Sequence, residues 1–346
     1  MDQTFGKGRH LAALSFCDLF EKGKKRIVSA WRNCKGGGDC KGHAMPNRFD
    51  LPAAVMLITL AAVWGGSFFF AEIALRELPP LTITLHRVVW AVPILLVVLH
   101  LRHIPLPRAP RIWGAYLVMG ALNNAIPFSL IFWGQQQIDS GLASILNGTT
   151  AMFGAVVAGI LLKDEPLTPN KLMGAALGLA GVAVIMGPGV LSGLDPSNLA
   201  QLAIIAAALS YAFASVWGKT TLAGQPPLMN AAGMLIGSVV LMLPLVLIVD
   251  GVPSLSLHPA TWGAVIGVAA LSTALAYVLY FAILVRAGAA NLMLVTLLIP
   301  PFAIGLGAAF LGERLPSSAF AGFAVIALGL AVTDGRLFRS HSVKRS

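Results

Sequence analysis

The stretch from Trp64 to Leu81, WGGSFFFAEIALRELPPL, returns with changes as Tyr211 to Leu228, YAFASVWGKTTLAGQPPL. The two stretches align at an offset of 147 residues, and both end in Pro-Pro-Leu. The tetrapeptide EPLT at Glu165 likewise matches ERLP at Glu313, at an offset of 148. A chain with such self-similarity is built from two related halves, and its architecture follows from that duplication.

Composition places both halves in a lipid bilayer. Of the 346 residues, 57% are hydrophobic and 11% are charged, and the mean hydropathy is +0.81. These values exclude a soluble enzyme or a nucleic-acid-binding domain. About 20 apolar residues cross a hydrocarbon core roughly 30 Å thick as a helix. We therefore expect an all-α polytopic membrane protein with ten spans, near residues 52–74, 80–101, 112–134, 139–162, 169–188, 197–217, 228–249, 260–284, 289–311 and 317–335.

Each half, 51–190 and 196–335, then holds five spans. Because five is odd, the second half enters the membrane from the opposite side, and the halves form inverted repeats. Such a pair favours a central pathway that opens alternately to either face. Duplication is also a simple way to build a helix bundle that transports nothing.

Lys and Arg residues give the orientation. With a cytoplasmic N-terminus, eleven of these residues lie inside and two lie outside, and cytoplasmic loops carry such an excess. The outside residues are Arg76 and Arg314. The inside residues are Arg102, Arg108, Arg111, Lys163, Lys171, Lys219, Arg286, Arg336, Arg339, Lys344 and Arg345. Both termini are therefore predicted to be cytoplasmic.

The segments 1–50 and 336–346 are predicted to be basic cytoplasmic tails. Residues 1–50 carry ten Lys and Arg against five Asp and Glu. This segment is expected to be disordered, to lie on an anionic membrane surface, or to precede a true start at Met45. All three cysteines, Cys17, Cys34 and Cys40, fall in it, and their spacing fits no common zinc site. We expect neither a metal ion nor a cofactor.

Several motifs together resemble the EamA-type branch of the drug/metabolite transporter superfamily over residues 52–335. The motifs are Trp64-Gly65-Gly66-Ser67-Phe68, Pro80-Leu81 followed by Arg87, Asp139-Ser140-Gly141-Leu142-Ala143-Ser144, and the recurring Glu165 and Glu313. The resemblance implies a ten-helix inner-membrane carrier, commonly an exporter of amino acids or other small metabolites. The chain departs from the family at Glu72, where a Lys is frequent, and in the first 50 residues.

Polar side chains near the span centres are the candidates for a substrate site. No HExxH, nucleophile elbow or P-loop occurs in a usable context, so we do not expect an enzyme. Asn123 and Asn124 need partners in hydrocarbon and are expected to line the pathway. Single hydroxyls can instead bond between helices, and aromatic rings can simply pack the core. The candidate residues are Trp64, Arg87, Asn123, Asn124, Asn147, Tyr211, Ser272, Thr273 and Tyr277.

Arg87 is the residue of the expected spans whose transfer into the hydrocarbon core costs the most free energy. It lies about 5 Å from the midplane by helical rise. Its guanidinium either binds a carboxylate of the substrate or pairs with Glu72, and both interpretations remain open. Glu72 and His86 are the titratable groups nearest the expected cavity, and hence the candidates for ion coupling. His86 points about 100° away from Arg87 and is also compatible with a packed or interfacial histidine.

From the sequence we therefore predict a secondary transporter that works by alternating access. Its partners are a small-molecule metabolite and the lipid bilayer, and not nucleic acid. The alternative is a membrane receptor or sensor scaffold that transports nothing.

Overall fold

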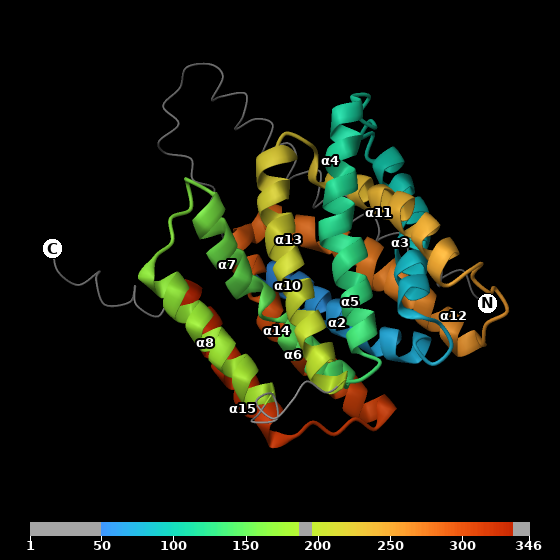
Figure 1. Ribbon diagram of the computed structural model, residues 1–346. Coiled ribbons are helices and arrows are strands. Elements are labelled where there is room, and N and C mark those ends of the chain that lie inside the picture. The colour runs from blue at the N-terminus through green and yellow to red at the C-terminus, as the bar shows by residue number, and fades with distance from the viewer. Residues whose placement is uncertain (1–49, 187–195, 335–346) are drawn as a thin grey trace, which may run out of the picture.

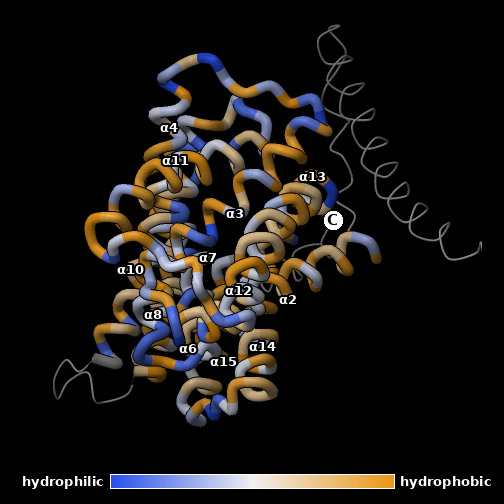
Figure 2. Tube along the Cα trace, turned by 90° about the vertical axis from the view of Figure 1, so that its right-hand side faces the viewer, coloured by the Kyte–Doolittle hydropathy of each residue, from blue (hydrophilic) through white to orange (hydrophobic). Residues whose placement is uncertain are grey.

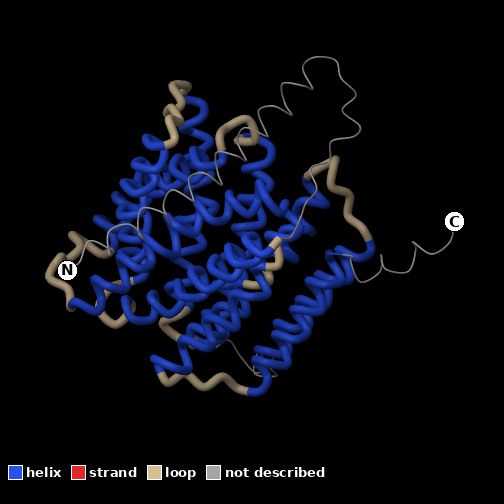
Figure 3. The backbone as a smooth tube through the Cα atoms, turned by 180° about the vertical axis from the view of Figure 1, so that it is seen from behind, coloured by secondary structure: helices blue, strands red, loops and turns tan. Residues whose placement is uncertain are grey.

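The computed structural model describes residues 50–186 and 196–334, and this part of the chain is helical without any strand (Figures 1 and 3). The expectations for the two tails and their cysteines lie outside the described residues. The elements in chain order are α2 (Leu51–Ala74), α3 (Pro80–Leu101), α4 (Pro110–Gly120), η2 (Ala121–Ala125), α5 (Ile126–Gly134), α6 (Ser140–Asn147), α7 (Thr150–Leu161), α8 (Pro169–Met186), α10 (Pro196–Thr221), α11 (Pro227–Val249), α12 (Pro259–Ile266), η3 (Gly267–Leu275), α13 (Ala276–Leu292), α14 (Val295–Leu306), η4 (Gly307–Leu311) and α15 (Ser317–Asp334).

The helices match the lengths and apolarity that a bilayer requires. In the described ranges, eight helical stretches are long and apolar enough to cross a membrane. Two shorter apolar stretches, Val295–Leu311 and Ser317–Thr333, follow them. Figure 2 shows hydrophobic residues along the helices and hydrophilic residues mainly in the connections. The chain is a multi-pass membrane protein.

Local sequence determines where these helices begin. Six helices of the described part start at a proline, whose fixed φ suits the first turn and whose missing N–H is not needed there. Helix α2 begins at Leu51 instead, and the carboxylate of the preceding Asp50 accepts a hydrogen bond from the Ala53 N–H at 3.1 Å. That bond satisfies one of the free donors at the helix N-terminus.

Two spans contain local irregularities. The helical stretch Ser140–Leu161 corresponds to the span expected at 139–162, and it has a turn between α6 and α7, where Thr149 and Thr150 donate hydroxyl hydrogen bonds to the carbonyls of Leu146 and Asn147 at 2.7 and 2.6 Å. Such back-bonding competes with the regular helical ladder. Within α13 the helical conformation is broken at Gly288, whose φ is +80°, so the eighth membrane-spanning stretch ends there and a short helical piece to Leu292 precedes α14.

The two halves interdigitate. Each of the most extensive helix pairings joins one half to the other: α8 with α15, α3 and α4 with α11, α2 with α14, and α5 and α7 with α10. Figure 1 shows α8 and α15 side by side along one edge of the bundle. Their backbones meet at Gly181 and Gly322, where a Cβ on Gly181 would lie 2.8 Å from the Gly322 carbonyl oxygen. Glycine therefore permits this close approach.

The third span of each half contains a π-helical segment at its centre. Segment η2 separates α4 from α5, and η3 separates α12 from α13. A π-helical turn widens the helix locally and is frequent at functional sites. Asn124 lies in η2, and Ser272 and Thr273 lie in η3. Each widened turn therefore carries polar residues predicted for the substrate site.

Candidate functional site

Arg87 is the centre of a polar cluster between the two halves. Its side chain is 8% exposed. Nε donates to Thr273 Oγ1 and Nη1 donates to Ser67 Oγ, both at 3.0 Å, while Nη2 lies 3.5 Å from the Ser272 carbonyl oxygen. The guanidinium carbon lies 3.7 Å from the centre of the Phe128 ring, so a cation–π contact holds the charge in place.

The expected alternative, an ion pair with Glu72, is not formed. Arg87 donates its hydrogen bonds to neutral oxygens, and none of the described carboxylates accepts one from it. The Glu72 carboxylate instead lies 3.5 Å from Gln135 Nε2, near the end of the bundle. Burying a charge without a counter-ion is costly. Arg87 therefore carries a charge that the described residues do not neutralise.

A second group of hydrogen bonds joins η2 to α13 and α11. Tyr277 donates its hydroxyl to Asn124 Oδ1 at 3.2 Å and accepts from Asn123 Nδ2 at 3.1 Å. Asn124 is fully buried and donates from Nδ2 to Ser238 Oγ at 2.9 Å. Both expected asparagines thus have partners, and these partners come from the second half.

Tyr211 of α10 lies beside the Arg87 group. Its ring contacts Phe128 edge to face, with 6.5 Å between the ring centres. Phe128 is the ring that also faces Arg87. The two groups, together called the cluster below, contain seven of the nine predicted substrate residues: Arg87, Asn123, Asn124, Tyr211, Ser272, Thr273 and Tyr277.

The side chains of Trp64 and Asn147 form no hydrogen bond with this cluster. The Trp64 ring lies 5.9 Å from that of Tyr280, and the neighbouring Val63 carbonyl accepts the Ser272 hydroxyl at 2.7 Å. The Asn147 Oδ1 atom is buried and accepts no hydrogen bond from the described residues.

His86 lies in a different environment from Arg87, as their angular separation on the helix predicts. Its Nδ1 accepts from Trp90 Nε1 at 3.1 Å, and its ring packs edge-on to Trp262. The neutral tautomer with a proton on Nε2 is therefore favoured, and Nε2 has no partner among the described residues.

Charged residues gather instead at the ends of the helices. Glu313 accepts hydrogen bonds from Ser140 N, Ser140 Oγ and Gly141 N, at 3.0, 2.9 and 3.2 Å. Desolvation and the nearby Glu313 charge raise the pKa of Asp139, the residue before α6. At another end, Arg286 Nε donates to Asp50 Oδ1 at 3.0 Å, which lowers the pKa of that carboxyl. In the described ranges, no group of three or more His, Cys, Asp or Glu is arranged to hold a metal ion.

The cluster also contains three residues that are not among the nine predicted from the sequence: Ser67, Phe128 and Ser238. Phe128 and Phe132 lie one helical turn apart and both face the Arg87 guanidinium, the latter at 5.9 Å. An aromatic pair at this spacing, one turn after Asn124, is a usable signal for a cation site.

Known proteins match this chain over both halves. The model of the EamA-like transporter family matches residues 51–187 and 198–333. The uncharacterized transporter YoaV of Bacillus subtilis (strain 168) is 27% identical over 278 residues, which are 79% of this chain and 94% of YoaV. The uncharacterized inner membrane transporter YedA of Escherichia coli (strain K12) is 29% identical over 195 residues, or 56% of this chain and 61% of YedA. A solved crystal structure with 18% identity superposes with a TM-score of 0.60 over 84% of this chain and 99% of that one, which concerns the fold alone.

Proposed function

This chain belongs to the EamA-like transporter family, and on that premise we propose that it is an inner-membrane secondary transporter that exports amino acids or related small metabolites. All ten apolar helical stretches cross the membrane, as two inverted five-span halves, 51–190 and 196–335. Transport proceeds by alternating access between these halves. Both termini are cytoplasmic.

Contacts between helix ends support this topology. With a cytoplasmic N-terminus, Asp50 and Arg286 fall on the inner side, and their side chains form an ion pair. Glu77 and Thr261 fall on the outer side, where the Thr261 hydroxyl donates to the Glu77 carboxylate at 2.6 Å. Each of these contacts would be impossible if its two partners lay on opposite faces of the membrane.

The substrate class is inferred from the positive charge of Arg87, which none of the described residues neutralises. A guanidinium has five N–H donors, and the described residues accept three hydrogen bonds from it. Two donors and a full positive charge are left for a ligand. A carboxylate satisfies both at once, because its two oxygens match the planar fork of Arg. The substrate class that fits is therefore a small metabolite with a free carboxylate.

The tyrosines indicate how the substrate reaches this charge. Tyr211 and Tyr277 are surrounded by the bundle and lie close enough to Arg87 to interact with its charge, yet both side chains keep accessible surface, as does Asn123. We take that surface to face the interior between the halves. Hydroxyl and amide groups there can bind the polar part of an amino acid.

The test is uptake into proteoliposomes that contain the purified protein. The panel compares radiolabelled amino acids with their carboxamides and with uncharged nucleosides, with and without a pH gradient. We expect transport of at least one amino acid and at least tenfold weaker transport of its carboxamide. Equal transport of acid and amide would remove Arg87 from the substrate site. A well-folded protein that moves no compound of the panel would favour the scaffold alternative.

A further inference from the structure

The repeat places oppositely charged residues at equivalent positions in the two halves. The offset of 147 aligns Glu72, near the end of α2, with Lys219, near the end of α10. The offset of 148 aligns Glu165 with Glu313. In the structure Lys219 forms an ion pair with Glu165. Glu72 lies beside Gln135, and Glu313 binds the start of α6 at Ser140, within electrostatic range of Glu72. The two pairs therefore occupy equivalent positions at the two ends of the bundle.

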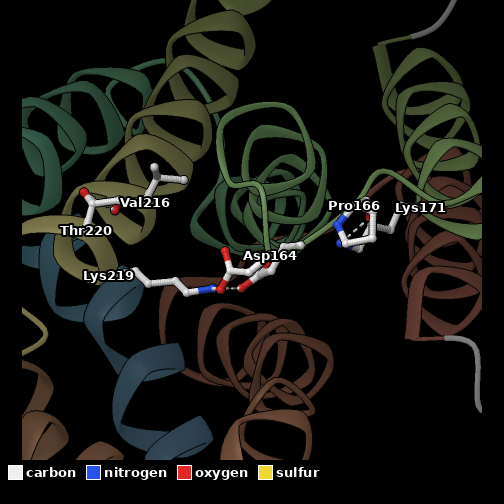
Figure 4. Close-up of polar contacts among 7 residues, drawn as sticks. Asp164, Pro166, Lys171, Val216, Lys219 and Thr220 are labelled. Atoms are coloured by element: carbon white, nitrogen blue, oxygen red, sulfur yellow. Dashed lines mark hydrogen bonds and ion pairs between the residues drawn. The ribbon is translucent and has the colours of Figure 1, made fainter.

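The first pair is an ion pair. Lys219 Nζ lies 2.7 Å from Glu165 Oε1 and 2.7 Å from Asp164 Oδ2, and Figure 4 shows Lys219 reaching Asp164 from its helix. The contact joins α10 of the second half to the connection after α7 of the first half. In the proposed topology this ion pair closes the cytoplasmic end. Because Lys219 supplies the positive charge, the closed contact requires no bound proton or other cation.

The equivalent pair at the outer end consists of two acids. Glu313 follows η4 and is held by three donors at the beginning of α6, which stabilise its negative charge. This contact also joins the two halves, because α6 belongs to the first half and η4 to the second. Glu72, in the position that Lys219 occupies at the other end, adds a like charge to the closed contact.

Glu72 has little to stabilise a negative charge. The charged groups that face it are Glu313, Asp139 and the single cation Arg76. Its hydrogen-bond donor is Gln135 Nε2, at the long distance of 3.5 Å. The same Gln135 side chain is 2% exposed, and its Oε1 atom accepts no hydrogen bond from the described residues. A carboxylic acid at Glu72 would remove the repulsion from Glu313 and supply a donor beside this unsatisfied acceptor.

We propose that Glu72 is a proton-binding site that must be protonated for the outer end of the transporter to close. The inference rests on the proposed alternating access. It adds that proton release accompanies opening of the outer end and that proton binding accompanies its closure. The outer end opens as Glu72 releases its proton, and it closes again when a proton returns. The cytoplasmic end carries Lys219 at the equivalent position, so its closure takes up no proton. A proton is the ligand proposed because it both neutralises Glu72 and supplies the hydrogen-bond donor that the buried Gln135 Oε1 lacks.

The direction of the pH effect follows from this linkage. A proton that binds only the closed form favours closure at low pH. The ratio of outward-open to outward-closed molecules should rise by up to tenfold per pH unit over the range in which one proton is released.

The test measures the outer end directly and needs no substrate. Spin labels are placed at exposed positions of the two halves, Gln137→Cys and Ser317→Cys, with Cys17, Cys34 and Cys40 replaced by Ser. Distances between the labels are measured by pulsed electron paramagnetic resonance in lipid nanodiscs between pH 5.5 and 8.5. We expect a short distance at low pH and a growing long-distance population as the pH rises.

Three further variants test whether Glu72 is the side chain that binds the proton. Glu72→Gln, a neutral mimic of the protonated acid, should keep the short distance at every pH. Glu72→Lys should do the same by pairing with Glu313, as Lys219 pairs with Glu165. Glu77→Gln is the matched control, because Glu77 is an acid of the same end that already has hydrogen-bond donors, and it should leave the pH response unchanged.

The proposal is overturned if the wild-type distances do not change with pH, or if Glu72→Gln responds to pH like the wild type. Either result leaves the transport assignment intact when proteoliposome uptake is normal. Conversely, a pH response that disappears in Glu72→Gln, in a protein that transports none of the panel, would sustain the proton site and favour the scaffold alternative over transport.

Discussion

Replacing Arg87 separates substrate binding from support of the fold. Arg87→Lys keeps the positive charge and loses the planar fork. If one charge-assisted hydrogen bond to the substrate carboxylate is lost, the cost is about 1.5–3 kcal/mol. That is a fall of about 10- to 150-fold in affinity for carboxylate substrates. We expect this loss in KM for uptake by proteoliposomes, with normal expression.

Arg87→Met has a different expected signature. It removes three hydrogen bonds to neutral oxygens and the contact with Phe128, and it also removes a buried charge whose desolvation costs several kcal/mol. Because Thr273 still donates to the Val268 carbonyl at 2.9 Å, one former partner keeps a hydrogen bond of its own. We expect the free energy of unfolding to change by no more than about 1 kcal/mol, or about 2 °C in melting temperature for a chain of this size. Uptake of carboxylates should be lost.

Melting temperature and uptake are to be measured on the same preparations. Arg314→Lys, which makes the same change in an exposed connection, is the control and should behave like the wild type. Normal carboxylate uptake by a stable Arg87→Met protein would refute the binding role. A large loss of stability in Arg87→Met that Arg87→Lys restores, together with wild-type KM in Arg87→Lys, would make the residue a structural element of the core.

Three other changes test the architecture. Deleting residues 2–44, so that the chain starts at Met45, should preserve insertion and transport; an abundant but inactive truncation would give the tail a function. Reporter fusions after Gly189 should lie outside and those after Gly224 inside, and the reverse pattern would contradict the inverted repeat. Gly237→Leu should lower the melting temperature, because a Cβ there already lies 2.9 Å from a carbonyl carbon of α4; unchanged thermal unfolding would show that this interface can adjust.

The sequence predicts depth in the membrane better than direction around a helix. Hydropathy located the helices and placed Arg87, Asn124 and Ser272 near one level. Hydropathy does not specify the direction in which a side chain points around its helix. That direction decides that Arg87 faces Phe128 rather than Glu72. Partners such as Ser67 and Phe128 are ordinary residues of an apolar span, and only the packing of the two halves brings them to the guanidinium.

The irregularities within the spans have local causes. At the turn after Asn147, two threonine hydroxyls donate to carbonyl groups three residues earlier, and a hydropathy average does not register such bonds. Gly288 breaks the helix before the ninth span, because its positive φ lies outside the right-handed helical region. The expected domain boundaries and site roles remain predictions.

The pairing of helices across the two halves has a consequence for biogenesis. Helices α3 and α8 pack most extensively with α11 and α15, which begin 147 and 148 residues later in the chain. At a translation rate of 5–20 residues per second, a newly inserted helix waits about 7 to 30 s before its partner leaves the ribosome. During that interval the Arg87 charge has none of its second-half acceptors, Thr273 and Ser272 among them. The first half must therefore be retained by the insertion machinery, or shielded by lipid head groups and water, until the second half arrives.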